Sequence, residues 1–260
     1  EKMGKRILFV NSSLTGGGAE RVMTLLANEF VNKGYDTTMV LLREKKPDAY
    51  KLDSRIKLVR FRYGTNNKVF IAVKRYYMLR QLLKSTRFDG VISFMYDINV
   101  MTLVSAWGLK LPIIISERND PSARNKSSLY NWFQYKIYLT AKRIVFQTKQ
   151  VKKMFPSDLQ DISVVIPNPV NSSLPDMYTE SREKIIVAAG RLVEQKNFTM
   201  LIRAFARLHE KHNEYKLIIY GDGPLLPILK DEAINLKVEE YVKFPGYIND
   251  VNLKCIYLFC

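Results

Sequence analysis

The chain has 260 residues, of which 47% are hydrophobic and 25% charged, as in an ordinary globular protein with one large or two medium domains. No apolar run approaches the ~18 residues of a membrane span, and the N-terminus lacks the layout of a secretory leader. Two cysteines exclude a disulfide framework, so we expect a cytoplasmic protein. The net charge of +16 favours an anionic partner: nucleic acid, an anionic membrane surface or a phosphorylated substrate.

Short apolar runs alternate with amphipathic segments through the first two thirds of the chain. Helical spacing of apolar residues predicts helices at 19–34, 68–86, 97–108 and 127–141, with a short basic helix after residue 147. Strands are predicted at 6–10, 37–42, 57–61, 89–94, 112–116, 143–147 and 163–167. This alternation is typical of an α/β domain with a parallel sheet covered on both faces.

The composition changes at residues 167–184, which are rich in Pro, Ser and Asn and lack apolar periodicity. We expect an N-terminal domain at 1–166, a linker at 167–184 and a second α/β domain at 185–260. Its predicted strands are 184–190, 215–221, 240–246 and 255–260, with helices at 197–211, 224–236 and 249–254. A doubly wound domain usually has five or six strands, so we expect this second domain to be incomplete.

Two cations follow the first strand of the second domain. Arg191 comes directly after Gly190, and Lys196 lies just before the next predicted helix. Ligands of open α/β sheets bind at the carboxyl ends of the strands, and a guanidinium with an ammonium suits a diphosphate. The helix that follows offers further N–H donors. The alternative is two solvated cations on a loop.

Two glycine-rich turns also link a strand to a helix. "TGGGAERV" at 15–22 matches neither G-x-G-x-x-G nor a P-loop, yet it allows a ligand close to the backbone. The alternative is a flexible turn in which Glu20 interacts only with the helix dipole. "YGDGP" at 220–224 has the same placement, and a structural role is as well supported as a ligand-binding one.

The segment "ISERND" at 115–120 places Glu117, Arg118 and Asp120 at the carboxyl edge of the first sheet. A carboxylate there can orient a hydroxyl or act as a base. The alternative is a cluster of loop salt bridges.

Basic residues mix with aromatic ones at 68–87 and 128–143. A basic amphipathic helix can lie on an anionic membrane surface, and the alternative is a half-buried helix with a solvated face. The cations expected to face a membrane are Lys74, Arg75, Arg80, Lys84 and Arg87.

Other chemistries have little support in the sequence. His209 and His212 lie on a polar helix face, where we expect both to be solvated, and no third ligand suggests a zinc site. No histidine follows a strand as a Ser-His-Asp triad requires, and the lysine of a P-loop is missing. No nucleic-acid motif accompanies the basic segments, so we expect neither a metal nor nucleic acid.

Several motifs together resemble the retaining glycosyltransferases of family 4. The chain carries, in the order that this family has them, "GGGAERV", "PNPV", "GRLVEQKNFTMLIRAF", "YGDGP" and "VKFPGYINDV". The resemblance covers essentially the whole chain, and the G-R-L-x-x-x-K-N block is its most specific part. It implies the GT-B architecture: two Rossmann-like, doubly wound domains that face each other across a cleft.

The resemblance implies a retaining hexosyltransferase that uses a UDP- or GDP-sugar donor and no cofactor. Arg191 and Lys196 would bind the diphosphate and stabilise the departing nucleotide. The donor site would include the glycines Gly17, Gly18, Gly190, Gly221 and Gly223.

The acceptor would lie on the N-terminal domain near Glu117, which the resemblance makes a catalytic candidate, and near Arg118 and Asp120. "ISERNDP" resembles enzymes that build bacterial surface polysaccharides such as capsule or lipopolysaccharide. Their acceptors are often polyprenyl-diphosphate-linked sugars, which suits a peripheral place on the inner face of the membrane.

The family has a later motif, two glutamates eight positions apart, expected just beyond Cys260. We therefore expect activity of the complete protein and weak donor binding by this chain. A non-catalytic protein that binds a nucleotide sugar or acts as a scaffold is the alternative, and that glutamate motif distinguishes the two.

Overall fold

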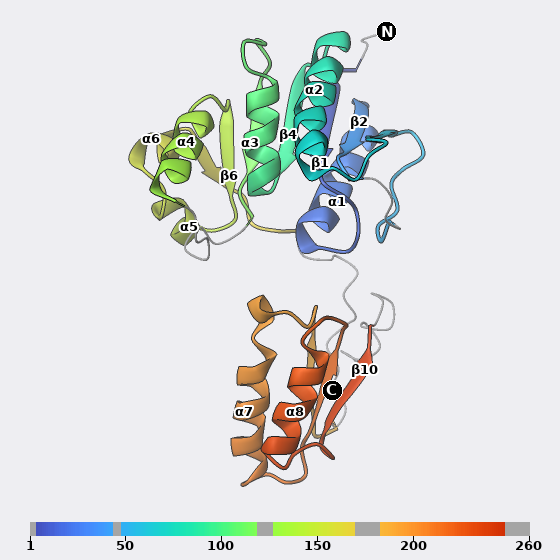
Figure 1. Ribbon diagram of the computed structural model, residues 1–260, viewed down its shortest axis with the longest axis vertical. Helices are drawn as coiled ribbons and strands as arrows, with labels where there is room; N and C mark the ends of the chain where they lie inside the picture. Colours follow the sequence, from blue (N-terminus) through green and yellow to red (C-terminus); the bar gives the residue numbers. More distant parts are fainter. Residues whose placement is uncertain (1–3, 44–47, 119–126, 170–182, 248–260) are drawn as a thin grey trace. The chain divides into compact units, whose positions relative to one another are not determined.

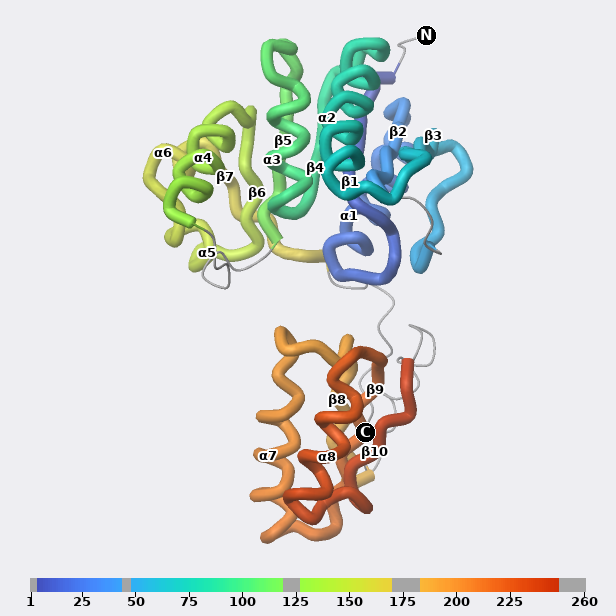
Figure 2. The backbone as a smooth tube through the Cα atoms, viewed as in Figure 1, coloured from blue at the N-terminus to red at the C-terminus, as the bar shows by residue number. Residues whose placement is uncertain are grey.

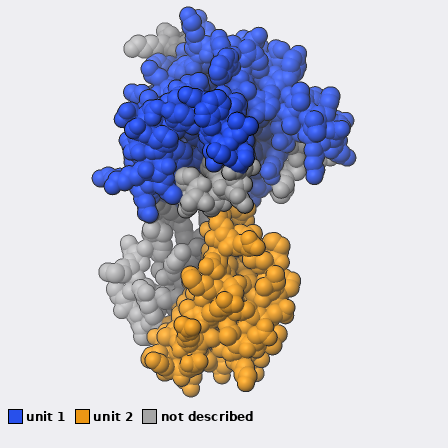
Figure 3. Space-filling model, turned by 60° about the vertical axis from the view of Figure 1, so that its left-hand side comes forward, with its two compact units in different colours: residues 1–170 blue, residues 171–260 orange. Residues whose placement is uncertain are grey.

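The computed structural model describes residues 4–43, 48–118, 127–169 and 183–247. The chain divides into two compact units, residues 1–170 and 171–260, which Figure 3 shows in different colours. The boundary falls inside the segment predicted as a linker, most of which lies outside the described residues.

Unit 1 is built on a seven-stranded parallel sheet with the order β3-β2-β1-β4-β5-β6-β7. The strand order reverses between β1 and β4, which lie side by side in register (Figure 2). Such a switch point leaves a crevice at the carboxyl ends of the two strands, where ligands of these folds bind. The strands are β1 (Arg6–Asn11), β2 (Asp36–Leu41), β3 (Lys57–Arg60), β4 (Gly90–Phe94), β5 (Ile113–Ser116), β6 (Arg143–Phe146) and β7 (Ser163–Val165).

Helices cover both faces of this sheet (Figure 1). Alternate residues of β1 point to opposite faces: Phe9 packs with α1, whereas Leu8 belongs to the core under α2, α3 and α4. Because both faces are buried, the four central residues of this strand, Ile7 to Val10, are all apolar. The helices are α1 (Gly18–Asn32), α2 (Lys68–Ser85), α3 (Tyr96–Ser105), α4 (Ser128–Tyr138), α5 (Lys149–Lys153) and α6 (Ser157–Asp161).

Unit 2 has a parallel sheet of three described strands in the order β10-β9-β8. Phe198, Ile202 and Phe205 recur at helical spacing on α7 and pack with Leu217 and Ile219 of the sheet in a separate core. The elements are β8 (Ile185–Ala189), a 3₁₀ turn (Glu194–Lys196), α7 (Phe198–His209), β9 (Lys216–Tyr220), α8 (Leu226–Asn235) and β10 (Val242–Gly246).

The predicted parallel α/β units are confirmed, and α6 is the described helix that the sequence pattern missed. The helix predicted at 249–254 and the strand at 255–260, with both cysteines, lie outside the described residues.

The prediction that both histidines are solvated is wrong for His209. Its ring packs 3.9 Å from the centroid of Tyr241 and also contacts Phe205. Among the helices described here, none has the length and apolar character to cross a bilayer.

Candidate functional site

The carboxyl end of β8 presents Arg191 and Lys196. Both residues are exposed, and neither side chain forms a hydrogen bond or ion pair within the described part of the chain. A Cβ atom on Gly190 would lie 3.5 Å from Cε of Lys196, so the lysine stem passes over this glycine. Two cations therefore stand at the strand end with their charges available to an anionic ligand.

The start of α7 adds donors beside Lys196. Asn197 has a left-handed backbone with φ of 49°, and its side chain does not cap the helix. The first N–H groups of α7 are thus left without a side-chain acceptor at Asn197. A helix N-terminus of this kind favours an anion through both its free N–H groups and its dipole.

Gly221 and Gly223 bring the loops after β8 and β9 together. Gly221 has φ of +135°, and a Cβ atom there would overlap the carbonyl oxygen of Gly190. A Cβ atom on Gly223 would overlap the carbonyl of Leu192, whose own amide donates to Asp222 O at 3.0 Å. The structure therefore gives these glycines a packing role that fixes the shape of the edge carrying Arg191.

The glycine loop after β1 is held by Glu20. The Oε2 atom of Glu20 accepts from the amides of Gly16 at 2.7 Å and Gly17 at 3.0 Å, and Oε1 accepts from the Ser13 hydroxyl at 2.8 Å. Gly16 alone in this loop needs a positive φ, 118°, while a Cβ on Gly18 would meet nothing within 4 Å. Glu20 is thus more than a partner of the helix dipole, and the capping-box spacing, three residues after Gly17, is the signal for it.

Glu117 directly follows β5 at the carboxyl edge of the sheet, as expected, but it is buried. Its side chain is 1% exposed and turned into unit 1, where Oε2 accepts from the Tyr138 hydroxyl at 2.8 Å. Burial and the neighbouring carboxylate raise the pKa of Tyr138 well above its usual value, so this hydroxyl keeps its proton. Glu117 is therefore a buried hydrogen-bond acceptor. Its role as a catalytic group or acceptor contact stays a prediction.

Arg118 points along the carboxyl edge of the sheet. Its guanidinium lies 4.1 Å from the centroid of Phe94 and donates to Oδ1 of Asn168, which follows β7. Burial lowers the pKa of Arg118 to about 10, so it is charged at neutral pH. Asp120 lies outside the described residues.

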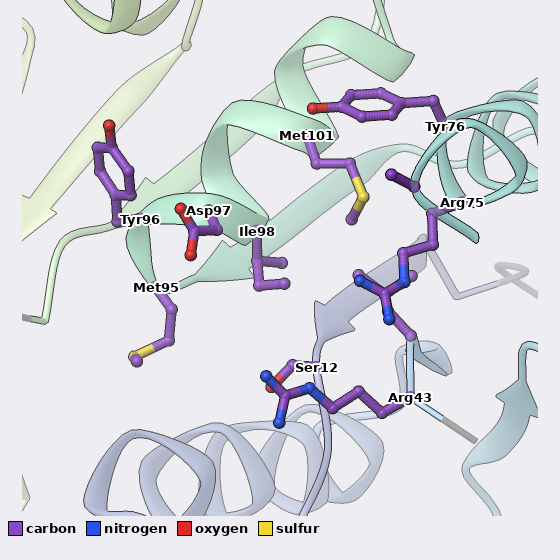
Figure 4. A pocket seen from close by; sticks show the side chains of 11 residues that line it. Ser12, Arg43, Arg75, Tyr76, Met95, Tyr96, Asp97, Ile98 and Met101 are labelled. Atoms are coloured by element: carbon purple, nitrogen blue, oxygen red, sulfur yellow. The ribbon is translucent and has the colours of Figure 1, made fainter. Parts of the chain in front are cut away.

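The structure places the five cations predicted to face a membrane in different environments. Lys74 donates to Tyr63 O at 2.8 Å, and Arg80 donates to the carbonyls of Ser105 and Trp107, each at 2.8 Å. These two side chains bind backbone carbonyls of unit 1, and their place facing a membrane stays a prediction. Lys84 and Arg87 are exposed, and Arg75 lines a pocket together with Ser12 and Arg43 (Figure 4).

Much of the exposed surface of α2 is apolar. Val69, Val73 and Tyr77 follow one another at four-residue spacing and are 76%, 65% and 63% exposed, with Phe70 beside them. We call these four residues the α2 stripe.

Among the residues that the structure describes, no group of three or more His, Cys, Asp or Glu side chains is placed to hold a metal ion.

Two family descriptions together match most of the chain. Glycosyltransferase Family 4 matches residues 16–174, more than half of the sequence, and Glycosyl transferases group 1 matches residues 176–260.

Two curated relatives are similar over nearly all of the chain. One is GalNAc-alpha-(1->4)-GalNAc-alpha-(1->3)-diNAcBac-PP-undecaprenol alpha-1,4-N-acetyl-D-galactosaminyltransferase of Campylobacter jejuni. It is 29% identical over 259 residues, covering 97% of this chain and 70% of the relative. The other is the amylovoran biosynthesis glycosyltransferase AmsD of Erwinia amylovora, at 25% identity over 95% of this chain and 74% of the relative.

The fold is also that of solved glycosyltransferases. The structure of Anabaena HepE in complex with UDP and glucose superimposes with a TM-score of 0.75 at 15% identity, covering 98% of this chain and 72% of that one. The family matches and this likeness confirm the predicted fold class and the resemblance to family 4. The chain belongs to Glycosyltransferase Family 4 and is a glycosyltransferase with the GT-B fold.

Proposed function

We propose that the protein moves a sugar, with retention, from a UDP- or GDP-sugar to a glycan or a lipid-linked saccharide in bacterial polysaccharide or glycolipid assembly. The names of its relatives support this substrate class, since one acts on an undecaprenyl-diphosphate-linked saccharide and another in amylovoran biosynthesis. HepE, which shares the fold, was solved with UDP and glucose.

The observation that carries the proposal is the pair of cations at the end of β8, whose side chains have no partner in the part of the chain that the structure describes. When the glycosidic bond to the donor breaks, negative charge grows on the departing diphosphate. Arg191 and Lys196 are placed to stabilise that charge, with the N-terminus of α7 adding dipole and N–H donors. Side chains in this arrangement can serve where other enzymes use a divalent cation on the diphosphate.

A lipid-linked acceptor also requires a place near the membrane surface, and the α2 stripe supports that part of the proposal. Four exposed apolar side chains on one helix suit the boundary between head groups and acyl chains, with Lys84 and Arg87 exposed towards the end of the helix. Each cation near an anionic surface contributes about 1 kcal/mol, so the apolar side chains provide much of the expected attraction.

The test is a calorimetric screen of the complete protein against UDP- and GDP-sugars, followed by a transfer assay with lipid-linked saccharide acceptors and the bound donor. We expect one donor to bind and its sugar to appear on the acceptor with the anomeric configuration of the donor, read by NMR. Donor binding without transfer to any acceptor would favour the non-catalytic alternative. No binding of any nucleotide sugar would contradict the proposal altogether.

A further inference from the structure

A pocket of unit 1 lies between α4 and α6, at the side of the sheet away from the switch point. It has a volume of about 230 Å³, and its walls come from α4, from the turn before α6 and from α6 itself. Figure 1 shows α4 and α6 next to each other beyond β6. Because α6 leads into β7, the last strand of the sheet, this pocket is separate from the one lined by Ser12, Arg43 and Arg75.

Gln134 of α4 brings an unpartnered donor into this pocket. It shares the inward face of the helix with the buried residues Ile137 and Tyr138, three and four positions later. Gln134 is 8% exposed, and its Nε2 atom is buried without a hydrogen-bond partner in the described part of the chain. The Tyr138 hydroxyl lies near this amide but donates to Glu117. A buried donor without a partner is costly, so it points to a bound group that accepts from it.

The rings that form the walls are held in place by other contacts. The hydroxyl of Tyr135 donates to Asp158 of α6. The ring of Phe155 packs against that of Phe146, with 4.7 Å between their centroids. Gln160 donates to the carbonyl of Phe155 at 2.6 Å, which fixes the turn before α6. The walls are therefore ordered before a ligand arrives, which reduces the entropic cost of binding.

The lining combines apolar rings with carboxamides, and no charged side chain lines it among the described residues. Tyr135, Phe155 and Leu159 offer apolar surface. Gln134 and the exposed Asn131 offer amide donors and acceptors. An ion would find no opposite charge here, and a purely apolar molecule would leave the Gln134 amide unpaired.

A pyranose ring matches both parts of this lining. It has an apolar C–H face for the aromatic rings and hydroxyl or acetamido groups for the amides. The volume admits one such ring and is too small for a whole nucleotide sugar. A nucleobase is the other neutral ring with hydrogen-bonding groups, but saccharides are the molecules that a glycosyltransferase handles.

We propose that this pocket is a second saccharide site, which holds one sugar ring with its C–H face on Tyr135 and Phe155 and an oxygen acceptor on Nε2 of Gln134. The inference goes beyond the proposed transfer reaction, because the pocket includes neither Arg191 nor Lys196 and lies away from the switch point. A glycan that is bound elsewhere on the protein gains affinity when one of its sugar units occupies such a site.

Ligand-observed NMR tests the site without requiring turnover. The probes are the methyl α-glycosides of glucose, galactose, N-acetylglucosamine and N-acetylgalactosamine, each with the complete protein and a saturating nucleoside diphosphate in the donor site. Adenosine is the nucleobase probe. We expect saturation transfer to at least one glycoside. Gln134→Leu should weaken its binding about tenfold and Asn131→Ala about threefold, because each removes a hydrogen bond to the sugar.

The matched control is Gln150→Leu, which changes an exposed glutamine of α5 outside the pocket and should bind like wild type. Gln134→Leu has a second readout. Replacing an unpartnered buried amide by an apolar side chain of similar size should leave the Tm of the ligand-free protein unchanged or raise it. Asn131 is exposed, so Asn131→Ala decides the matter where Gln134→Leu folds poorly.

Three results would overturn the site. If wild type gives no saturation transfer to any glycoside, a water molecule satisfies Gln134. If a glycoside signal survives in both variants, the sugar lies elsewhere on the protein. If adenosine binds in a manner that depends on Gln134 and the glycosides do not, the pocket is not a saccharide site. Sugar transfer by the wild type alongside any of these results would leave the proposed function standing.

Discussion

The carboxyl edges of the two sheets both carry charged residues, but these residues differ in whether their side chains have hydrogen-bond partners. At the edge of unit 1, Glu20 and Glu117 have hydrogen-bond donors from their own unit. At the edge of unit 2, Arg191 and Lys196 have no side-chain partner among the described residues, although glycines hold their loop firmly. Whether a charged side chain has a hydrogen-bond partner therefore distinguishes groups that stabilise the fold from groups that are available to a ligand. The number of charged residues alone does not make this distinction.

The largest expected effect is on catalysis, through Lys196→Ala. Loss of a cation that stabilises the leaving diphosphate should lower kcat/KM by about 10²- to 10³-fold, because its charge is worth most as the bond breaks. Steady-state kinetics with the donor found in the screen measure this. Lys211→Ala, beyond the far end of the same helix, is the matched control and should retain wild-type kinetics. Equal kinetics of both variants would place Lys196 among the solvated cations.

The next effect concerns the scaffold of the unit 2 edge. Gly221→Ala forces a side chain into a backbone with φ of +135° and onto the Gly190 carbonyl, so it should destabilise the protein by about 2–4 kcal/mol. Gly18→Ala, where a Cβ meets nothing, should stay within about 0.5 kcal/mol of wild type or gain slightly. Denaturant unfolding measures both changes. A neutral Gly221→Ala would remove the packing role of this glycine.

A smaller effect is expected from the buried pair in unit 1. Tyr138→Phe leaves Oε2 of Glu117 without its hydroxyl donor, which should cost about 1–3 kcal/mol of stability. Tyr135→Phe, whose hydroxyl donates to Asp158 at the surface, should cost clearly less stability. Thermal and denaturant unfolding compare the two. If Tyr138→Phe instead lowered activity at unchanged stability, the result would contradict a purely structural role of this pair.

The smallest effect concerns the glycine loop. Glu20→Ala removes the acceptor of two backbone amides and a hydroxyl, with an expected loss of about 0.5–2 kcal/mol. Hydrogen exchange of the Gly16 and Gly17 amides should quicken. Glu29→Ala, on the same helix in an exposed pair with Lys33, should change stability by less than about 0.5 kcal/mol. Unaltered exchange at Gly16 would show that the loop does not depend on Glu20.

Local patterns predicted most of the fold because most of the described strands and helices carry their own apolar periodicity, with α6 as an exception. The position of Arg191 and Lys196 was also predictable, since a strand, a glycine and a cation in succession fix them at a sheet edge. The same pattern applies to Arg43, which directly follows the apolar run containing β2 and lines a pocket with Ser12 and Arg75, so the sequence held a signal for this pocket residue as well.

The remaining assignments needed contacts between distant residues. Glu117 is buried because Tyr138, 21 residues later, folds over it, and Lys74 is occupied because the Tyr63 carbonyl lies within reach. Nothing in the sequence next to either residue distinguishes a partnered side chain from a free one. Only the packed helices of unit 1 decide which charges remain available.

The central claim is that Arg191 and Lys196 bind the diphosphate of the donor. The most direct measurement is calorimetry of a nucleoside diphosphate and the matching monophosphate with wild type and the double variant Arg191→Gln/Lys196→Gln. The account predicts that wild type prefers the diphosphate by about tenfold or more and that the variant loses this preference while still binding the monophosphate. A double variant that keeps the full preference for the diphosphate would contradict the account.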